Sequence, residues 1–582
     1  MTEYFEVIDR DGAARIGTLR LADAITTPAL VDDVLEETGS LWSGEQAVPD
    51  GDESTLSVLP HRAFPAGTPT EVQTAFEPNY PDVAFPSAAV VSPETAGDHG
   101  TDAYVLAGAS GFTGHSAAFV EAIIATREAI PPDAGVYLPG IATPGNVATL
   151  AAAGADLFDT DRAVVRGTQG WYLTADGEYR LGNLDELPCA CSACQQGIEA
   201  FDREDCVEHN VATLEAELRT VRNRIRQGRL RDYLEGQARH EQWLTATMRR
   251  LDDEYDYLET RTPLVRKAEI TAASDDTLGR VEIQRFAERV TERYQCRFDA
   301  PLVLVPCSAT KPYSESQSHD QFHDAINFRG HLASITSPIG VVPQELELTY
   351  PAQHYDTVVT GRWSETEIAF VADVLEAYLR DNDYPRVIAH VPEDYREITE
   401  RVEERLGESF EYTVADHPTT EESLSTLSET LAGESKYRKR ERQHNVVRAI
   451  ADYQFGKGAG DALFDDLQVE SRYPKLRVND ADGEQLAAMV PEYGVLSLTL
   501  AGARRWLEAD VPVKRVEIDD FVPHGSVLAP GIVDADESIR VGDEVVFEGP
   551  SALAVGRANM SGPEMVQSTR GIASDVRHVT ER

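Results

Sequence analysis

One short stretch limits the fold more than any other: an apolar run followed at once by a loop of reactive side chains. The run 301–305, PLVLV, predicts a buried strand. The loop 306–319, PCSATKPYSESQSH, carries Cys307, Lys311, Tyr313, Ser316 and His319. Because α/β folds place their chemistry where strands end in loops, we predict an α/β region with a reactive site at this strand end. The two prolines of the loop restrict its backbone.

Similar units recur along the chain. At 582 residues we expect about three or four domains. Apolar runs predict strands at 104–107, 135–138, 302–305, 340–342 and 386–390, and helical patterns cover 117–130, 146–153 and 365–380. Residues 205–295 are rich in Glu, Arg and Leu and should be helical. The last ~70 residues alternate short strands with Gly and Pro, which is typical of a small β-barrel.

The charge is extreme, with 100 acidic and 53 basic residues and a net charge of −47. The acids are spread over the whole chain, and only seven lysines occur, the first of them Lys267. This composition indicates adaptation to a salt-rich cytoplasm, where the Debye length falls to ~3 Å at 1 M salt and self-repulsion is screened. Net acidity therefore does not exclude a nucleic-acid partner here.

Other features indicate a cytoplasmic protein that does not associate with membranes. No apolar run approaches the ~20 residues of a membrane helix, and the N-terminus does not resemble a signal peptide. Three of the six cysteines fall within six residues, which is typical of a metal site in a reducing compartment.

The clustered thiols predict zinc. Cys189, Cys191 and Cys194 precede His209 by a short interval, and together they offer three thiolates and one imidazole. Such a set leaves no open position, so the metal should be structural. Cys206 competes with His209 as the fourth ligand, and the sequence leaves this choice open.

Two segments of this acidic chain are locally basic. Six arginines and no acid lie between Leu218 and Arg231, and a second basic run spans Lys436–Arg442. In such an acidic chain we expect these segments to meet phosphates. The candidate RNA-binding residues are Arg222, Arg226, Arg229, Lys436, Arg438, Lys439 and Arg440.

The pattern PC-x3-KPY-x2-S-x2-H at 306–319 resembles the hallmark of the archaeosine synthases, which modify archaeal tRNA. The run 189–194, CxCxxC, and the runs YLPGIATP at 137–144 and GADLFD at 154–159 resemble the tRNA-guanine transglycosylases. From about Val516 the chain is similar to a PUA domain, a small RNA-binding barrel. The resemblance is weak over 20–130.

The resemblance implies a multidomain α/β protein. We expect a degenerate transglycosylase-like domain with the zinc site, a shortened TIM-like barrel, at 1–240, and a helical connector at 241–298. A three-layer α/β domain with the motif should follow at 299–430, a small α+β domain at 435–511 and the PUA domain at 512–582.

The barrel resemblance also places a carboxylate. Asp159 falls where the transglycosylases keep their nucleophile. No Asp-Ser-Gly-Gly-Phe-Gln run, which that family uses for base recognition and its second carboxylate, occurs in the chain. Asp159 is therefore either catalytic or a relic that shapes a base pocket.

The resemblance further implies an enzyme that adds a nitrogen nucleophile to the nitrile of 7-cyano-7-deazaguanine in the tRNA D-loop. Cys307 would attack the nitrile, Lys311 would lower its pKa, and His319 would transfer protons. Tyr313 would stack on the base or donate a hydrogen bond. The donor (lysine, glutamine-derived ammonia or free ammonium) stays open, as do a radical SAM partner enzyme and a homodimer. The alternatives are base exchange by a transglycosylase and a non-catalytic tRNA-binding subunit.

Overall fold

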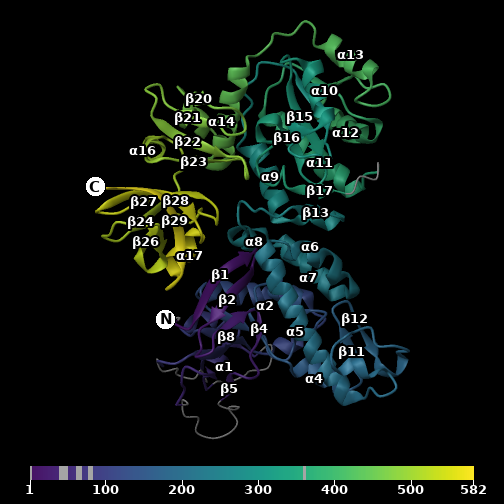
Figure 1. The fold of residues 1–582 in the computed structure, drawn as a ribbon, viewed down its shortest axis with the longest axis vertical. Helices are drawn as coiled ribbons and strands as arrows, with labels where there is room; N and C mark the ends of the chain where they lie inside the picture. Colours follow the sequence, from purple (N-terminus) through teal and green to yellow (C-terminus); the bar gives the residue numbers. More distant parts are fainter. Residues whose placement is uncertain (1–2, 38–49, 61–67, 76–82, 358–361) are drawn as a thin grey trace. The chain divides into compact units, whose positions relative to one another are not determined.

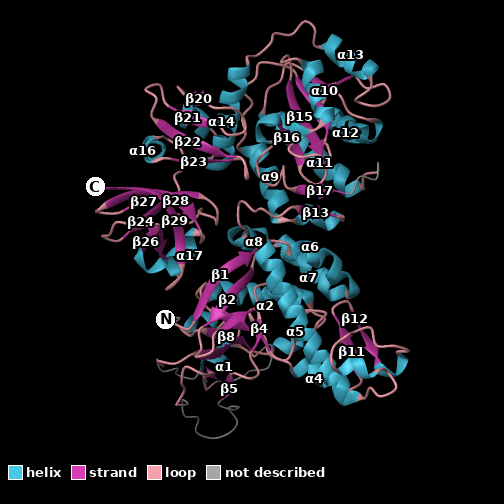
Figure 2. Cartoon of the chain, viewed as in Figure 1, coloured by secondary structure: helices cyan, strands magenta, loops and turns pink. Residues whose placement is uncertain are grey.

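The computed structural model describes residues 3–37, 50–60, 68–75, 83–357 and 362–582. Its contacts divide the chain into two compact units. The first comprises 1–263 with 528–532 and 560–573, and the second comprises the remainder, 264–527, 533–559 and 574–582. Figure 1 labels the elements and Figure 2 separates helices from strands.

The first unit is built on a seven-stranded sheet in which every neighbouring pair is parallel. Its order is β4 (Ala29–Leu30), β10 (Leu157–Phe158), β9 (Gly135–Tyr137), β8 (Ala103–Leu106), β7 (Ser87–Val91), β6 (Leu56–Val58) and β5 (Leu35–Glu37). Among the described residues β4 and β5 form the two edges, so the sheet is an open half-barrel. The expected shortened barrel is confirmed.

Helices and a small second sheet cover the half-barrel. Helices α2 (Ser116–Ala129), α3 (Val147–Ala152), α5 (Arg203–Gln227) and α7 (Gln242–Asp253) supply apolar residues to its core. The antiparallel strands β1 (Phe5–Asp11), β2 (Ala14–Leu19) and β3 (Ile25–Thr27) pack on the other side through Phe5 and Leu19. The hairpin β11 (Trp171–Thr174) and β12 (Gly177–Arg180) precedes the cysteine cluster.

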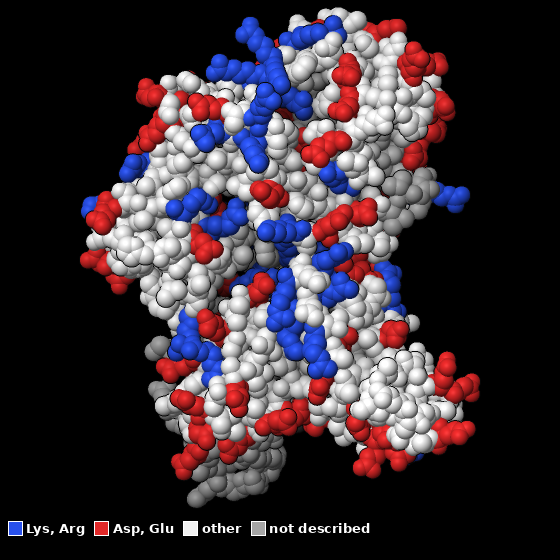
Figure 3. Space-filling model, in the orientation of Figure 1, with Lys and Arg blue, Asp and Glu red and all other residues white. Residues whose placement is uncertain are grey.

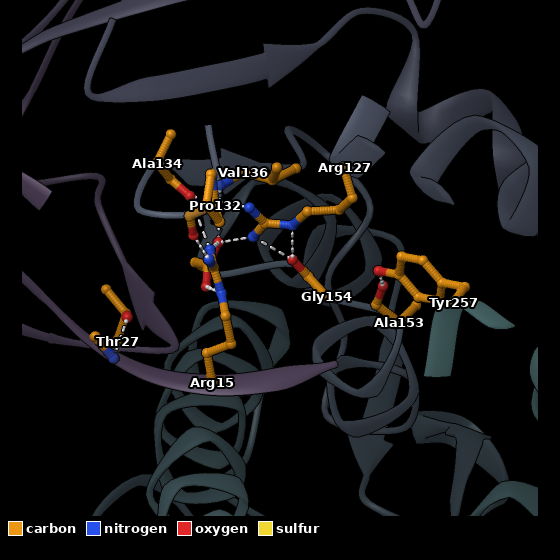
Figure 4. A network of polar contacts seen from close by, with 11 residues as sticks. Arg15, Thr27, Arg127, Pro132, Ala134, Val136, Ala153, Gly154 and Tyr257 are labelled. Carbon is orange, nitrogen blue, oxygen red and sulfur yellow. Dashed lines mark hydrogen bonds and ion pairs between the residues drawn. The ribbon is translucent and has the colours of Figure 1, made fainter. Parts of the chain in front are cut away.

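A buried ion network joins three of these elements (Figure 4). Arg15 of β2 donates to Asp156 at 2.7 Å and to the Ala134 carbonyl at 2.8 Å. Arg127 of α2 donates to Asp156 and to the carbonyls of Ala134 and Gly154. Asp156 also accepts the amide of Val136 at 2.8 Å, so this one buried carboxylate bridges two guanidinium groups at the amino end of β10.

The second unit contains a three-layer α/β domain, as expected. Its five-stranded sheet has the order β16 (Gly340–Pro343), β15 (His331–Thr336), β14 (Leu302–Pro306), β18 (Val387–Ala389) and β19 (Glu411–Tyr412). Leu302 and Leu304 face a core that includes α9 (Val281–Glu292), α11 (Glu365–Asp381) and α12 (Arg396–Leu406). Val303 and Val305 face α10 (Gln317–Ile326) and α13 (Glu421–Thr430).

The rest of the second unit continues the same core. Helices α14 (Lys439–Phe455), α15 (Ala459–Phe464) and α16 (Leu500–Glu508) pack with the sheet β20 (Gln468–Glu470), β21 (Arg477–Asn479), β22 (Gln485–Val490) and β23 (Val495–Leu498). A six-stranded sheet, most of whose residues belong to this unit, has the order β25 (Ser526–Leu528), β29 (Ile572–Glu581), β28 (Ala552–Ala558), β27 (Glu544–Glu548), β24 (Arg515–Ile518) and β26 (Ile532–Ala535).

Two expectations need correction. The stretch expected to be helical from 205 to 295 is interrupted at 262–280, where β13 (Ile270–Ala272) pairs in parallel with β17 (Tyr355–Thr357). Segment 416–434 is acidic and rich in Ser and Thr, a composition that predicts a linker or an exposed helix, but Leu427 of α13 and Leu431 just after it are buried against the sheet. The five domain boundaries stay a prediction. Within the described residues no helix is both long and apolar enough to span a membrane.

Candidate functional site

Cys307 lies directly after β14, at the carboxyl end of a parallel strand, and is partly exposed. Its sulfur is 3.6 Å from the hydroxyl of Tyr395, which the turn Glu393–Tyr395 supplies from 88 residues away. The Tyr395 ring meets the edge of Trp363 at 4.8 Å. Burial and the nearby Cys307 sulfur raise the pKa of Tyr395, so this hydroxyl keeps its proton and can donate a hydrogen bond.

Lys311 lies near Cys307 and packs against an aromatic ring. Its ammonium lies 4.0 Å from the centre of the Tyr355 ring, a cation–π contact. Burial lowers the pKa of Lys311, while the Cys307 sulfur and Asp356 oppose that shift. The Tyr355 hydroxyl is fixed at 2.6 Å from Tyr313 and 3.0 Å from Thr336. A thiol, a cation and three phenols therefore lie in one cluster.

His319 and Ser316 lie beneath this cluster. His319 is 1% exposed, and its ring nitrogens lie 3.1 Å from the hydroxyls of Ser316 and Ser334. Burial lowers its pKa to about 4. Ser316 caps α10 by accepting the amide of His319. Tyr313 stacks on the His319 ring at 4.9 Å. These contacts favour a structural role for His319 and Ser316 over a role in proton transfer.

A buried carboxylate anchors the loop. Glu347 accepts the amide of Ser314 at 2.8 Å and the hydroxyl of Tyr473 at 2.7 Å, and only 4% of the residue is exposed. Tyr473 comes from the loop between β20 and β21. No local pattern predicted Glu347, Tyr355 or Tyr395, because each reaches the motif from a distant segment.

The other cysteine of this domain has a different setting. Cys296 precedes β14, so it lies at the opposite, amino edge of the sheet. Its sulfur is 3.8 Å from His331, which pairs with Glu345 at 2.9 Å. Burial opposes a charge on His331, but Glu345 and Cys296 raise its pKa to about 10. Glu345 thus belongs to this cluster and not to the Cys307 loop.

Asp159 follows β10 at the carboxyl edge of the half-barrel. It accepts the Tyr137 hydroxyl at 2.8 Å, the Gly140 amide at 2.7 Å and the Asp161 amide at 3.1 Å. Burial raises its pKa even though these hydrogen bonds act in the opposite direction. The YLPG and GADLFD runs therefore fold into one carboxylate site.

The predicted metal ligands converge. The donor atoms of Cys189, Cys191, Cys194 and His209 all lie within 4.8 Å of one another. His209 directs Nδ1 toward the sulfurs of Cys191 and Cys194, at 3.5 and 3.4 Å, while its Nε2 donates to the Leu173 carbonyl at 2.9 Å. That second bond fixes the tautomer that leaves Nδ1 free to ligate. Cys206 instead donates to the Trp171 carbonyl, so His209 is the fourth member of the group.

The two basic segments differ in how their charges are used. On α5, Arg222 is partly buried against the Pro28 carbonyl and burial lowers its pKa, whereas Arg226 is exposed. Arg229 pairs with Asp232 at 3.0 Å. By contrast the second segment exposes Lys436, Arg438, Lys439 and Arg440.

Comparison with known proteins places these features in families. Residues 85–242 match the family model "Queuine tRNA-ribosyltransferase", and 445–512 match "Patch-forming domain C2 of tRNA-guanine transglycosylase". Residues 514–580 match the PUA domain. The α/β region with the Cys307 loop, 283–431, matches a domain of unknown function, DUF5591.

Full-length relatives decide the family. The "Archaeosine synthase" of Haloferax volcanii is 61% identical, and the match covers all of both chains. The chain belongs to the archaeosine synthase family. The "Archaeosine synthase subunit alpha" of Methanosarcina acetivorans is 42% identical, again over all of both chains. A "tRNA-guanine(15) transglycosylase" of Methanothermobacter thermautotrophicus is 29% identical over 79% of this chain and 68% of its own.

Membership in the archaeosine synthase family confirms the resemblance that the motifs predicted. The chain is accordingly a tRNA-modifying enzyme with a transglycosylase-like domain and a PUA domain. The role of each site residue stays a prediction.

Proposed function

We propose that this chain converts the nitrile of 7-cyano-7-deazaguanine in tRNA by adding a nitrogen nucleophile, with Cys307 as the attacking group. The observation that carries the proposal is the position of Cys307 at the carboxyl end of β14, with the Tyr395 hydroxyl at 3.6 Å and Lys311 within the same cluster. Nitrile carbons accept thiolates, and a thioimidate is more readily attacked by amines.

The thiolate and the proton that this reaction needs both come from the Cys307 cluster. A C–S bond forms between Cys307 and the nitrile carbon as the nitrile nitrogen takes a proton from Tyr395 or Lys311. An amine then attacks the same carbon and gives a proton back to the group that protonated the nitrile nitrogen, and the C–S bond breaks to return the thiolate. The product is an amidine-type carbon bearing two nitrogens. The donor amine would be lysine, ammonia from glutamine, or ammonium, and a radical SAM partner would act on a lysine adduct.

Mass spectrometry of nitrile-bearing tRNA, incubated with the protein and each donor, tests this function. Cys307→Ser should lose turnover by orders of magnitude and keep tRNA affinity. Cys296→Ser is the matched control, because it alters the other partly exposed thiol of the same domain and should retain turnover.

The transglycosylase alternative rests on Asp159, which the half-barrel holds at its carboxyl edge. If Asp159→Asn abolishes turnover while Cys307→Ser does not, base exchange in the half-barrel replaces our proposal.

We also propose that Cys189, Cys191, Cys194 and His209 hold a structural zinc ion. Three thiolates and one imidazole match the ligand preference of zinc. When bound, the metal would tie the segment after β12 to the first turns of α5. No chemistry of the nitrile involves this site.

A further inference from the structure

An exposed aromatic ring lies beside the second basic segment. Phe328 is 37% exposed, and among the large hydrophobic side chains that the structure describes only one other exposed residue, Tyr179, is aromatic. Phe328 follows α10 in the turn that leads to β15. An exposed ring of this kind has a flat apolar face available for a ligand.

The backbone at this turn is strained. Asn327 and Phe328 both have positive φ, 48° and 62°. Asn tolerates the left-handed region and ends the helix there, but a bulky residue such as Phe rarely adopts it. Strain of this kind persists only where the surroundings hold it, and it gathers at functional sites.

The contacts that hold Phe328 come from the basic segment itself. The amide of Tyr437 donates to the Phe328 carbonyl at 2.9 Å. The two rings meet edge to face at 5.5 Å, and Tyr437 also packs on Phe298 at 4.7 Å. The exposed ring is therefore fixed to the residue that lies between Lys436 and Arg438.

The cations next to Tyr437 are exposed and can contact a ligand. Lys436, Arg438, Lys439 and Arg440 are exposed, and no carboxylate in the described part of the chain forms an ion pair with any of them. Figure 3 shows Lys and Arg side chains gathered at the top of the view, where the chain enters α14. This segment lies between the residues matched to the α/β domain and those matched to the C2 domain, so neither family model covers it.

We propose that Phe328 and the cations of 436–440 form one RNA-binding surface, on which the ring stacks against an unpaired base while the cations hold the flanking phosphates. Such pairing of an aromatic platform with a basic track is how proteins bind single-stranded nucleotides. The proposal rests on the proposed function, in which tRNA is the substrate, and it adds that this face binds unpaired nucleotides.

The ring contributes a part of the RNA-binding energy that does not depend on salt. Attraction between cations and phosphates falls steeply as salt rises, because each counterion released gains less entropy when the bulk salt concentration is high. Stacking depends on burying apolar faces and survives high salt. A chain with a net charge of −47 cannot rely on charge alone to hold RNA, and an aromatic platform supplies the part of the binding that salt does not weaken.

Fluorescence anisotropy with an unmodified tRNA transcript and a short unstructured RNA, at 0.2 M and 2 M KCl, tests the surface. Phe328→Ala should weaken binding of both RNAs roughly tenfold at both salt concentrations. Phe328→Trp should restore binding. Tyr179→Ala removes the other exposed aromatic side chain and should leave affinity unchanged. Replacing the four cations with alanine should matter most at 0.2 M.

Phe328→Gly guards against misfolding, because it removes the ring and relieves the positive φ; it should bind RNA weakly while remaining at least as heat-stable as the wild type. Wild-type affinity of Phe328→Ala and Phe328→Gly for both RNAs would overturn the surface. The proposal would also be overturned if these variants bound RNA normally but lost self-association in light scattering, because this face would then be a protein contact. Conversion of the nitrile is assayed separately, so the surface can fail while the proposed function stands.

Discussion

The phenol of Tyr395 distinguishes the two partly exposed thiols of the α/β domain. Cys307 has an uncharged hydroxyl at 3.6 Å and a cation nearby, whereas Cys296 lies against the buried His331–Glu345 pair. The first setting leaves the sulfur at the strand edge where α/β folds bind ligands. The second is enclosed by Tyr384, Phe298 and Asn382, which suits a structural role.

At the level of single residues, Tyr395→Phe should lower the single-turnover rate of nitrile conversion roughly a hundredfold, because a positioned proton donor contributes about that much. Binding of tRNA should be unchanged. Tyr384→Phe, which removes a hydroxyl near Cys296, is the control. An unaltered rate in Tyr395→Phe would leave Lys311 as the proton donor.

His319 predicts a pH dependence of stability. Its pKa is about 4 in the folded chain and about 6.5 in an unfolded one. Between these values the unfolded state binds more protons, so stability falls as pH drops from 6.5 toward 4, by up to about 3 kcal/mol. His319→Gln lacks the titrating imidazole and so does not lose this stability at low pH. The difference in melting temperature between wild type and variant should therefore become smaller as the pH falls. His417→Gln, at an exposed position, should show a constant gap.

At the level of elements, the two carboxylates of the GADLFD run act at opposite ends of β10. Asp159 faces the carboxyl edge, while Asp156 joins β2 and α2 to the sheet. Asp156→Ala leaves two buried guanidinium groups without their partner, so it should destabilise the first unit by about 3–5 kcal/mol. Chemical denaturation measures this. Asp161→Ala, at an exposed position, should cost far less.

Metal removal tests the element formed by the hairpin β11–β12 and the start of α5. A strong chelator should release one zinc per chain and lower the melting temperature, because binding energy at a structural site is folding energy. Cys191→Ser should abolish zinc in elemental analysis, whereas Cys206→Ser should retain it. A Cys206→Ser protein without zinc would make Cys206 the fourth ligand.

At the level of the whole molecule, charge dominates. With 100 acidic residues against 53 basic ones, repulsion opposes folding at low ionic strength. The melting temperature should therefore rise steadily as KCl increases from 0.1 to 2 M. Sucrose at matched osmolality provides the control, since it does not screen charge. A melting temperature that is flat in KCl would show that ion pairs within the fold already balance the repulsion.

Local patterns accounted for much of the architecture. The run at 302–305 is β14, the 3.6-residue periodicity at 365–380 is α11, and the CxCxxC run lies with His209, because each signal is contained in one short segment. The interior strand β15 was not predicted, because the buried polar residues His331, Ser334 and Thr336 interrupt the continuous apolar run expected of a strand with two buried faces. The break at 262–280 was missed because composition alone suggested helix.

The sequence by itself determined the family, the cluster of three thiols at 189–194 and the reactive loop, because motifs at fixed spacing specify residue types near in the chain. The tertiary structure decided which distant groups join them. Tyr395, Tyr355 and Glu347 reach the Cys307 loop from other segments, and His319 turns inward as a buried support. Phe328 and Tyr437 meet across more than a hundred residues. Such pairings depend on how strands and helices pack, which no local pattern encodes.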